Sequence, residues 1–121
     1  MQKLIAEVTE CVEREYGRAS AKFGPINNSD HESYAILLEE LDESKDEIFH
    51  VEGHLNALWD YVKRNQHDVV KVQECVNIER TAILAACELI QVAAMAKKAG
   101  ITICNRNASA ELCNETVGDS V

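Results

Sequence analysis

Apolar residues recur at intervals of three and four along most of the chain, which is the spacing of one face of an α-helix. The pattern begins at the amino terminus and predicts a first helix over about residues 2–22. Its apolar stripe consists of Leu4, Val8, Cys11, Val12, Tyr16, Ala19 and Phe23. The only proline, Pro25, then lies in a cluster of turn-forming residues that separates this helix from the next.

Two longer helices are predicted downstream. Ser29 and Glu32 have the spacing of a capping box, in which the two residues satisfy free N–H groups at a helix start. The helical period runs from there to Lys63 and resumes after a polar break, where Asp68 can cap the third helix. We expect that helix to end at Gly100, with a break near residues 77–81 as an alternative.

These elements predict an all-α fold, a helical bundle built on a long antiparallel helix hairpin with the amino-terminal helix packed on it. Residues 1–99 would form a single domain and residues 100–121 a polar tail, with at most a short helix around residues 108–113. Three helices leave an apolar stripe uncovered. We therefore expect a homodimer or homotetramer that completes the bundle.

Composition narrows the classes of function. The chain has 121 residues, 46% of them hydrophobic, and a net charge of −9 that repels phosphate backbones and anionic lipid surfaces. Because of this charge we expect no nucleic-acid partner. We also expect no membrane partner, because the longest apolar stretch, residues 82–96, is interrupted by Glu88 and Gln91 and falls short of the roughly 20 residues that a membrane span needs. Five cysteines without a Cys-x-x-Cys pair, and no export signal, suggest reduced thiols in a cytoplasmic protein.

Acidic residues in the second and third helices provide the candidate chemistry. A carboxylate inside the apolar stretch 82–96, such as Glu88, is costly unless a cation or hydrogen bonds compensate it. If the hairpin turns between residues 65 and 66, Glu43 comes level with Glu88, and Glu40 with Gln91. Glu47 lies beside Glu43, whereas Glu39 points away from the apolar stripe. Hard divalent cations would relieve the repulsion, although a solvated acidic face is the alternative.

These residues resemble a known family. The segments Glu39-Glu40-Leu41-Asp42-Glu43 and Glu88-Leu89-Ile90-Gln91 resemble the Glu-Glu-x-x-Glu and Glu-x-x-Asp signature of the MazG-like all-α nucleoside triphosphate pyrophosphohydrolases. The resemblance extends over about residues 23–98 and includes two departures. The 44 residues between Glu43 and Glu88 exceed the usual gap between the two motifs, which longer helices explain, and Gln91 occupies the position of an aspartate ligand.

The resemblance implies hydrolysis of a (deoxy)nucleoside triphosphate between its α and β phosphates, giving a monophosphate and pyrophosphate. It assigns Glu40, Glu43 and Glu88 as ligands of Mg²⁺, with Mn²⁺ as a substitute, and Gln91 as a fourth ligand through its carbonyl. Glu39 becomes the candidate for orienting or deprotonating the attacking water, and the set Glu39, Glu40 and Glu43 is therefore the expected catalytic group. Lys97 and Lys98 are candidates for contacting the phosphates, or else they offset the helix dipole.

Other interpretations compete. Glu47 and His50 have the Glu-x-x-His spacing of a ferritin-like di-iron site, but the third helix supplies no second copy of that motif. His50 and His54 are spaced like a zinc pair without the rest of a metalloprotease motif and are expected to be exposed. Trp59 is assigned to the core or to a subunit contact. The main rival is a MazG-like interaction module without catalytic activity, which the glutamine at position 91 favours.

Overall fold

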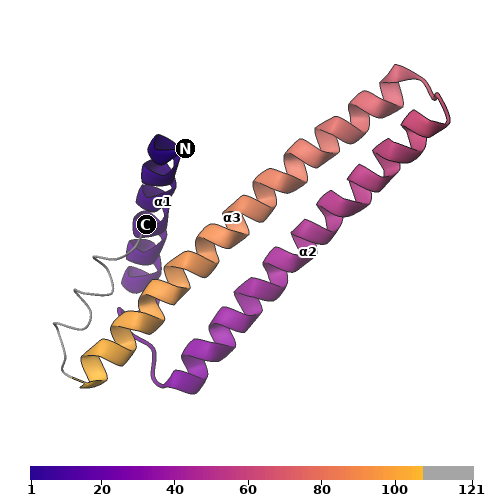
Figure 1. Cartoon of the computed structure of the whole chain (residues 1–121). Coiled ribbons are helices and arrows are strands. Elements are labelled where there is room, and N and C mark those ends of the chain that lie inside the picture. Colours follow the sequence, from indigo (N-terminus) through magenta and orange to yellow (C-terminus); the bar gives the residue numbers. More distant parts are fainter. Residues whose placement is uncertain (108–121) are drawn as a thin grey trace. The chain divides into compact units, whose positions relative to one another are not determined.

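The computed structural model describes residues 1–107 and contains three helices: α1 (Gln2–Phe23), α2 (Asp30–Lys63) and α3 (Asp68–Asn107) (Figure 1). Within the described residues there is no strand, so the predicted all-α class is confirmed. The short helix expected around residues 108–113 lies outside the described residues.

Local sequence signals account for the helix boundaries. The backbone N–H of Glu32 donates to Ser29 Oγ at 3.1 Å, so the hydroxyl half of the predicted capping box is present at the start of α2. After α1 ends at Phe23, Gly24 adopts a φ of 93° and its N–H donates to the carbonyl of Ser20 at 2.9 Å. Asn65 has a φ of 52° in the turn after α2, a conformation that asparagine tolerates better than most residues.

In α3 the alternative of a break near residues 77–81 is not realised, and the expected end at Gly100 is wrong. The helix is continuous through residues 77–81, where Thr81 Oγ1 donates to the carbonyl of Asn77 at 2.8 Å. It also continues past Gly100 to Asn107. Gly100 does not adopt the positive φ of a helix cap, and Thr102 beyond it accepts a hydrogen bond at 2.9 Å from the backbone N–H of Asn27. This contact with the loop before α2 favours the extra helical turns over the glycine stop.

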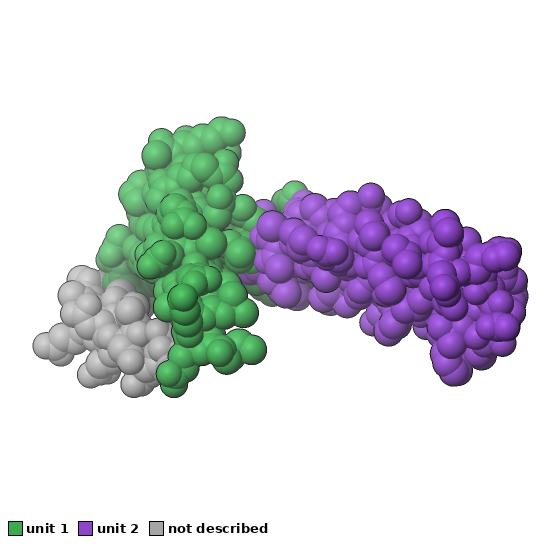
Figure 2. All heavy atoms as spheres, turned by 90° about the horizontal axis from the view of Figure 1, so that it is seen from above, with its two compact units in different colours: residues 1–39, 90–121 green, residues 40–89 purple. Residues whose placement is uncertain are grey.

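The chain divides into two compact units, coloured separately in Figure 2. Unit 1 contains residues 1–39 and the part of the chain from residue 90 onward, and unit 2 contains residues 40–89. In unit 1, Ala94 and Ala99 of α3 are buried, and Asn27 Nδ2 donates to the buried Ser33 Oγ at 2.8 Å. No residue of α1 is fully buried, so its apolar stripe is only partly covered.

In unit 2, the buried side chains are small. Ser44 of α2 has no exposed surface, and Thr81 and Ala85 of α3 are 6% and 7% exposed. The apolar stretch 82–96 is not buried on all sides, because Ile83 is 57% and Leu84 is 46% exposed. The physical reason is that the alanine and threonine face of α3 makes the close helix contact, which leaves the larger apolar side chains outside it.

Several individual expectations also receive an answer. Trp59 is 58% exposed and is therefore not a core residue of the single chain.

Cys11 and Cys75 are among the free thiols, but Cys104 is disulfide-bonded, so the expectation of reduced thiols is wrong at that residue. An odd number of cysteines excludes complete pairing and leaves room for a single pair. Within the described part of the chain, no helix combines the length and apolar character needed to cross a bilayer.

Candidate metal centre

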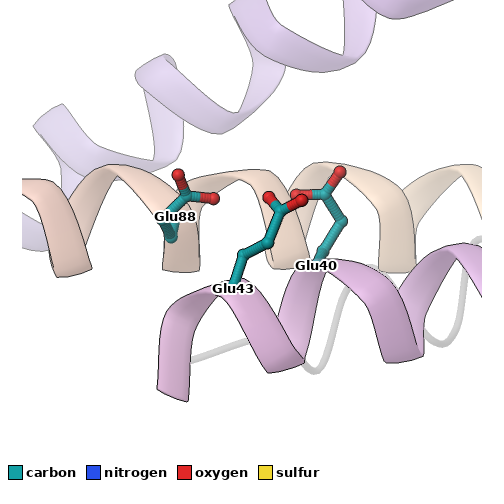
Figure 3. Close-up of side chains that lie close together, drawn as sticks. All are labelled: Glu40, Glu43 and Glu88. Carbon is teal, nitrogen blue, oxygen red and sulfur yellow. The ribbon is translucent and has the colours of Figure 1, made fainter. Parts of the chain in front are cut away.

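Three of the predicted carboxylates meet in unit 2. Glu40 and Glu43 lie one turn apart on α2, and Glu88 projects from α3 toward them (Figure 3). One ligand oxygen from each residue can be chosen so that all three lie within 4.8 Å of one another. Glu40 and Glu88 are half-buried and Glu43 is exposed, so the group is accessible from solvent on one side. Among residues 1–107, this is the one group of three or more acidic, histidine or cysteine side chains with metal-binding geometry.

Small side chains beside the cluster explain why the two helices come close enough. Ser44 follows Glu43 directly, is completely buried, and donates from Oγ to the backbone carbonyl of Glu40 at 3.0 Å. Ala85 precedes Glu88 by one helical turn on α3 and is 7% exposed. Because these positions occupy little volume, the glutamates at their edges span the remaining distance and place their carboxylates together.

The electrostatics of the cluster are unfavourable for three ionised carboxylates. Desolvation raises the pKa of Glu88 above its ordinary value, and the nearby charge of Glu43 and hydrogen bonding with its carboxyl group raise it further. The charge of Glu47 adds to the same effect. A divalent cation would reverse this balance, since it favours the ionised form of each ligand.

Glu47, which the sequence suggested only as a neighbour of Glu43 and as part of a di-iron motif with His50, contributes to the electrostatics of the cluster. It is half-buried on α2, one turn after Glu43, and its Oε2 lies 3.5 Å from His50 Nδ1. The signal for it was the four-residue spacing from Glu43, which places both side chains on the same side of the helix.

Gln91 has a specific partner in unit 1. Its Nε2 donates to Glu15 Oε2 of α1 at 2.6 Å, and Arg18 donates to the same oxygen at 2.6 Å. The hydrogen bond from Arg18, and then that from Gln91, hold the pKa of Glu15 below its ordinary value. An aspartate at position 91 would place a second negative charge against Glu15, which gives a physical reason for the amide. The role of Gln91 as a fourth metal ligand stays a prediction.

The other predicted site residues take different positions. Lys97 Nζ lies 2.6 Å from both carboxylate oxygens of Glu13, and it also stands over the ring of Tyr16, 5.5 Å from the centroid. Lys98 is buried, with 4% of its surface exposed. Glu39 is exposed. Lys97 is thus engaged by an acidic residue of α1, and the proposed phosphate contacts of both lysines stay predictions.

The two histidines considered for metal binding have separate carboxylate partners. His50 is exposed beside Glu47, as expected. His54 was expected to be exposed, and this expectation is wrong. The residue is half-buried in unit 2, and its Nδ1 lies 3.0 Å from Glu74 Oε2 of α3. Its polar partner on the neighbouring helix accounts for the burial. Within the described residues, neither histidine belongs to a metal-binding group of three or more such side chains.

Comparison of the chain with protein-family models, with curated proteins and with solved structures gives no match.

Proposed function

We propose that this protein is a Mg²⁺-dependent nucleoside triphosphate pyrophosphohydrolase, which cleaves a (deoxy)nucleoside triphosphate into a monophosphate and pyrophosphate. The observation that carries the proposal is the convergence of Glu40, Glu43 and Glu88, with ligand oxygens within 4.8 Å of one another. The helical content and the motif resemblance point to the same class of enzyme.

The donor set fits the metal that the proposal requires. Three carboxylates from two helices offer the hard oxygen ligands that Mg²⁺ and Mn²⁺ prefer. Such an ion, when bound, supplies charge neutralisation at the phosphates and lowers the pKa of a water molecule. Glu40, Glu43 and Glu88 would hold it, and Gln91 would add its amide carbonyl.

The remaining roles fall to residues next to the cluster. Glu39 directly precedes Glu40 and is exposed, so it is our candidate for accepting a proton from the attacking water. Lys97 and Lys98 would offset the negative charge of the triphosphate, which requires Lys97 to exchange its contact with Glu13 for a phosphate oxygen. We further propose a cytoplasmic protein whose two long helices form an antiparallel hairpin within an oligomeric bundle.

A second function is favoured by one observation. Gln91 replaces a charged ligand of the family signature, and its amide is occupied by Glu15 at 2.6 Å. This is the arrangement expected of an interaction module that retains the helical fold without hydrolysis. The two functions make opposite predictions about turnover and about stabilisation by Mg²⁺.

The decisive experiment is an assay of a panel of canonical and modified (d)NTPs with Mg²⁺, in which pyrophosphate and monophosphate are measured separately. Wild-type protein should release both products in equal amounts, and Glu43→Gln should abolish this release. Glu52→Gln, an exposed glutamate of α2 outside the cluster, is the matched control and should retain activity. Orthophosphate with a diphosphate would indicate a different phosphohydrolase, and a folded protein without turnover would favour the interaction module.

A further inference from the structure

A chain of three polar side chains links α1 to α3 within unit 1. Arg18 donates from Nη2 to Glu15 Oε2 at 2.6 Å and from Nε to Glu15 Oε1 at 3.3 Å. Gln91 Nε2 donates to the same Oε2 at 2.6 Å. Glu15 and Gln91 are half-buried, whereas Arg18 is exposed. The carboxylate of Glu15 is thus held by a cation of its own helix and in turn holds the amide of Gln91.

This contact decides the orientation of the Gln91 amide. An ionised carboxylate can only accept hydrogen bonds, and an amide can donate only from its nitrogen. Glu15 therefore holds Gln91 in one of its two orientations, in which Nε2 points to the carboxylate and the carbonyl Oε1 is directed away from it. A partner that both donates and accepts, such as a second amide, would permit either orientation.

The carbonyl oxygen set in this way is a ligand of the kind that hard divalent cations accept. Gln91 follows Glu88 by three residues on the continuous helix α3, so the two residues lie on the same side of that helix. A charged acceptor on the N–H side also polarises the amide and increases the negative charge on its oxygen. The contact with Glu15 thus strengthens, as a ligand, the same atom that it orients.

We propose that Glu15 is a positioning residue, which orients the amide of Gln91 so that its carbonyl oxygen can bind the divalent cation of the carboxylate cluster. The inference rests on the proposed function, because that function supplies the ion. Glu15 itself would not touch the metal, and Arg18 offsets its charge. The occupied N–H end of Gln91 and a ligand role for its carbonyl end are therefore compatible.

The first test is a spectroscopic signature of Gln91 in wild-type protein. The chain has four glutamines, and labelling them with ¹³C makes each side-chain carbonyl carbon visible by NMR. The Gln91 resonance is identified by its loss in Gln91→Met. Saturating Mg²⁺ should shift this resonance, because ligation through Oε1 withdraws electron density from the carbonyl carbon. Gln73 is the internal control, since it is exposed on α3 and donates to Asn77 Oδ1 at 3.2 Å, and its resonance should not move.

The second test separates orientation from charge. Glu15→Asp keeps the negative charge but withdraws the carboxylate by one methylene, about 1.5 Å, which takes it out of hydrogen-bond reach of Gln91. Glu15→Gln removes the charge and permits both amide orientations. Both variants should keep the helical circular dichroism of wild type and raise the dissociation constant of Mn²⁺ about 10-fold, measured by electron paramagnetic resonance of the unbound ion. The Mg²⁺-induced shift of Gln91 should shrink in both.

Glu10→Gln is the matched control for the loss of a charge on α1, because Glu10 is exposed on the same helix. It should change the dissociation constant of Mn²⁺ by no more than about twofold, since exposed charges are screened by solvent and salt. If general attraction of the cation to α1 were the cause, Glu15→Asp would bind Mn²⁺ as tightly as wild type.

The outcomes distinguish this inference from the proposed function. A wild-type protein that binds Mn²⁺ and hydrolyses nucleotides, but whose Gln91 resonance does not respond to Mg²⁺, would overturn the positioning role and leave the proposed function intact. Wild-type Mn²⁺ affinity in Glu15→Asp would do the same. A wild-type protein that binds no Mn²⁺ would overturn both. The wild-type NMR measurement decides the question even if a Glu15 variant fails to fold.

Discussion

Replacing Glu88 by glutamine should stabilise the metal-free protein and at the same time remove its response to Mg²⁺. The substitution keeps the shape of the side chain and removes one of the three clustered charges. The pKa of Glu88 is raised in the folded protein, by desolvation first and by Glu43 second, so its ionised form destabilises the fold. The same charge is needed to hold a divalent cation. Stability and metal binding therefore make opposite demands on this residue.

The distances in the cluster set the magnitude. Two unit charges 4.8 Å apart repel by about 0.9 kcal/mol at the dielectric constant of water and by about 3.5 kcal/mol at an effective value of 20. Because Glu43 is exposed, the lower figure is closer, and we expect Glu88→Gln to gain about 1 kcal/mol without metal. This corresponds to an increase of about 4 °C in melting temperature. In wild type, Mg²⁺ at 100 times its dissociation constant should add about 2.7 kcal/mol, and the variant should lose this increment.

The assay is thermal and urea unfolding of both proteins, with and without Mg²⁺, at several pH values. Since the folded pKa of Glu88 lies above its unfolded value, the cost of its charge is fully present above the folded pKa. The cost disappears as the pH falls below the unfolded pKa. The metal-free advantage of Glu88→Gln should therefore be present at neutral pH and absent in acid. In Mg²⁺ at neutral pH, wild type should become the more stable protein.

Glu52→Gln, an exposed glutamate on α2 outside the cluster, is the control and should change neither quantity by more than about 0.5 kcal/mol. The reasoning is refuted if Glu88→Gln is less stable than wild type without metal at neutral pH. An undiminished Mg²⁺ response of the variant would refute the assignment of Glu88 as a ligand. These two results can occur separately, so the electrostatic and the metal-binding arguments are tested independently.

Three further predictions concern individual contacts within unit 1 or within unit 2. The pKa of Glu15 is held low in the folded protein, so its ionised form stabilises the protein at neutral pH, and this stability is lost as the pH falls through that pKa. Glu15→Gln should therefore weaken the loss of stability at acid pH, measured as the free energy of unfolding against pH. An unchanged loss of stability in acid would contradict the bond with Gln91. His54→Ala removes the 3.0 Å contact with Glu74 and should lower the free energy of unfolding by about 1 kcal/mol in urea titration, with equal stability of variant and wild type as the contrary result. Ser44→Leu should lower the free energy of unfolding by about 1–3 kcal/mol, because a larger side chain overpacks a fully buried position. Ser44→Ala should remain within about 1 kcal/mol of wild type. Equal stability of the two variants would show that the helices separate freely there.

Local patterns predicted the helices well because their signals involve neighbouring residues. The start of α2 follows from Ser29 and Glu32, and its end is followed by the polar turn containing Asn65. The end of α3 was missed because Thr102 is held by Asn27, a residue far away in the chain. The meeting of Glu43 with Glu88 was predictable from helix register and a single assumed turn. The hydrogen bond of Gln91 to Glu15 was not, since no local pattern pairs residues of α1 and α3.

The sequence by itself determined the all-α class, the order of the three helices and the set of carboxylates that could meet. The tertiary structure decided which side of α2 faces α3. Along α2, a half-buried polar residue lies directly beside an exposed apolar one, as in Glu40 and Leu41 or Glu47 and Ile48. Periodicity cannot choose between two faces that are one residue apart, and apolar character alone would have turned the leucine inward. Close contact through Ser44 selects the polar face instead, which brings the carboxylates together and leaves Leu41 and Ile48 exposed.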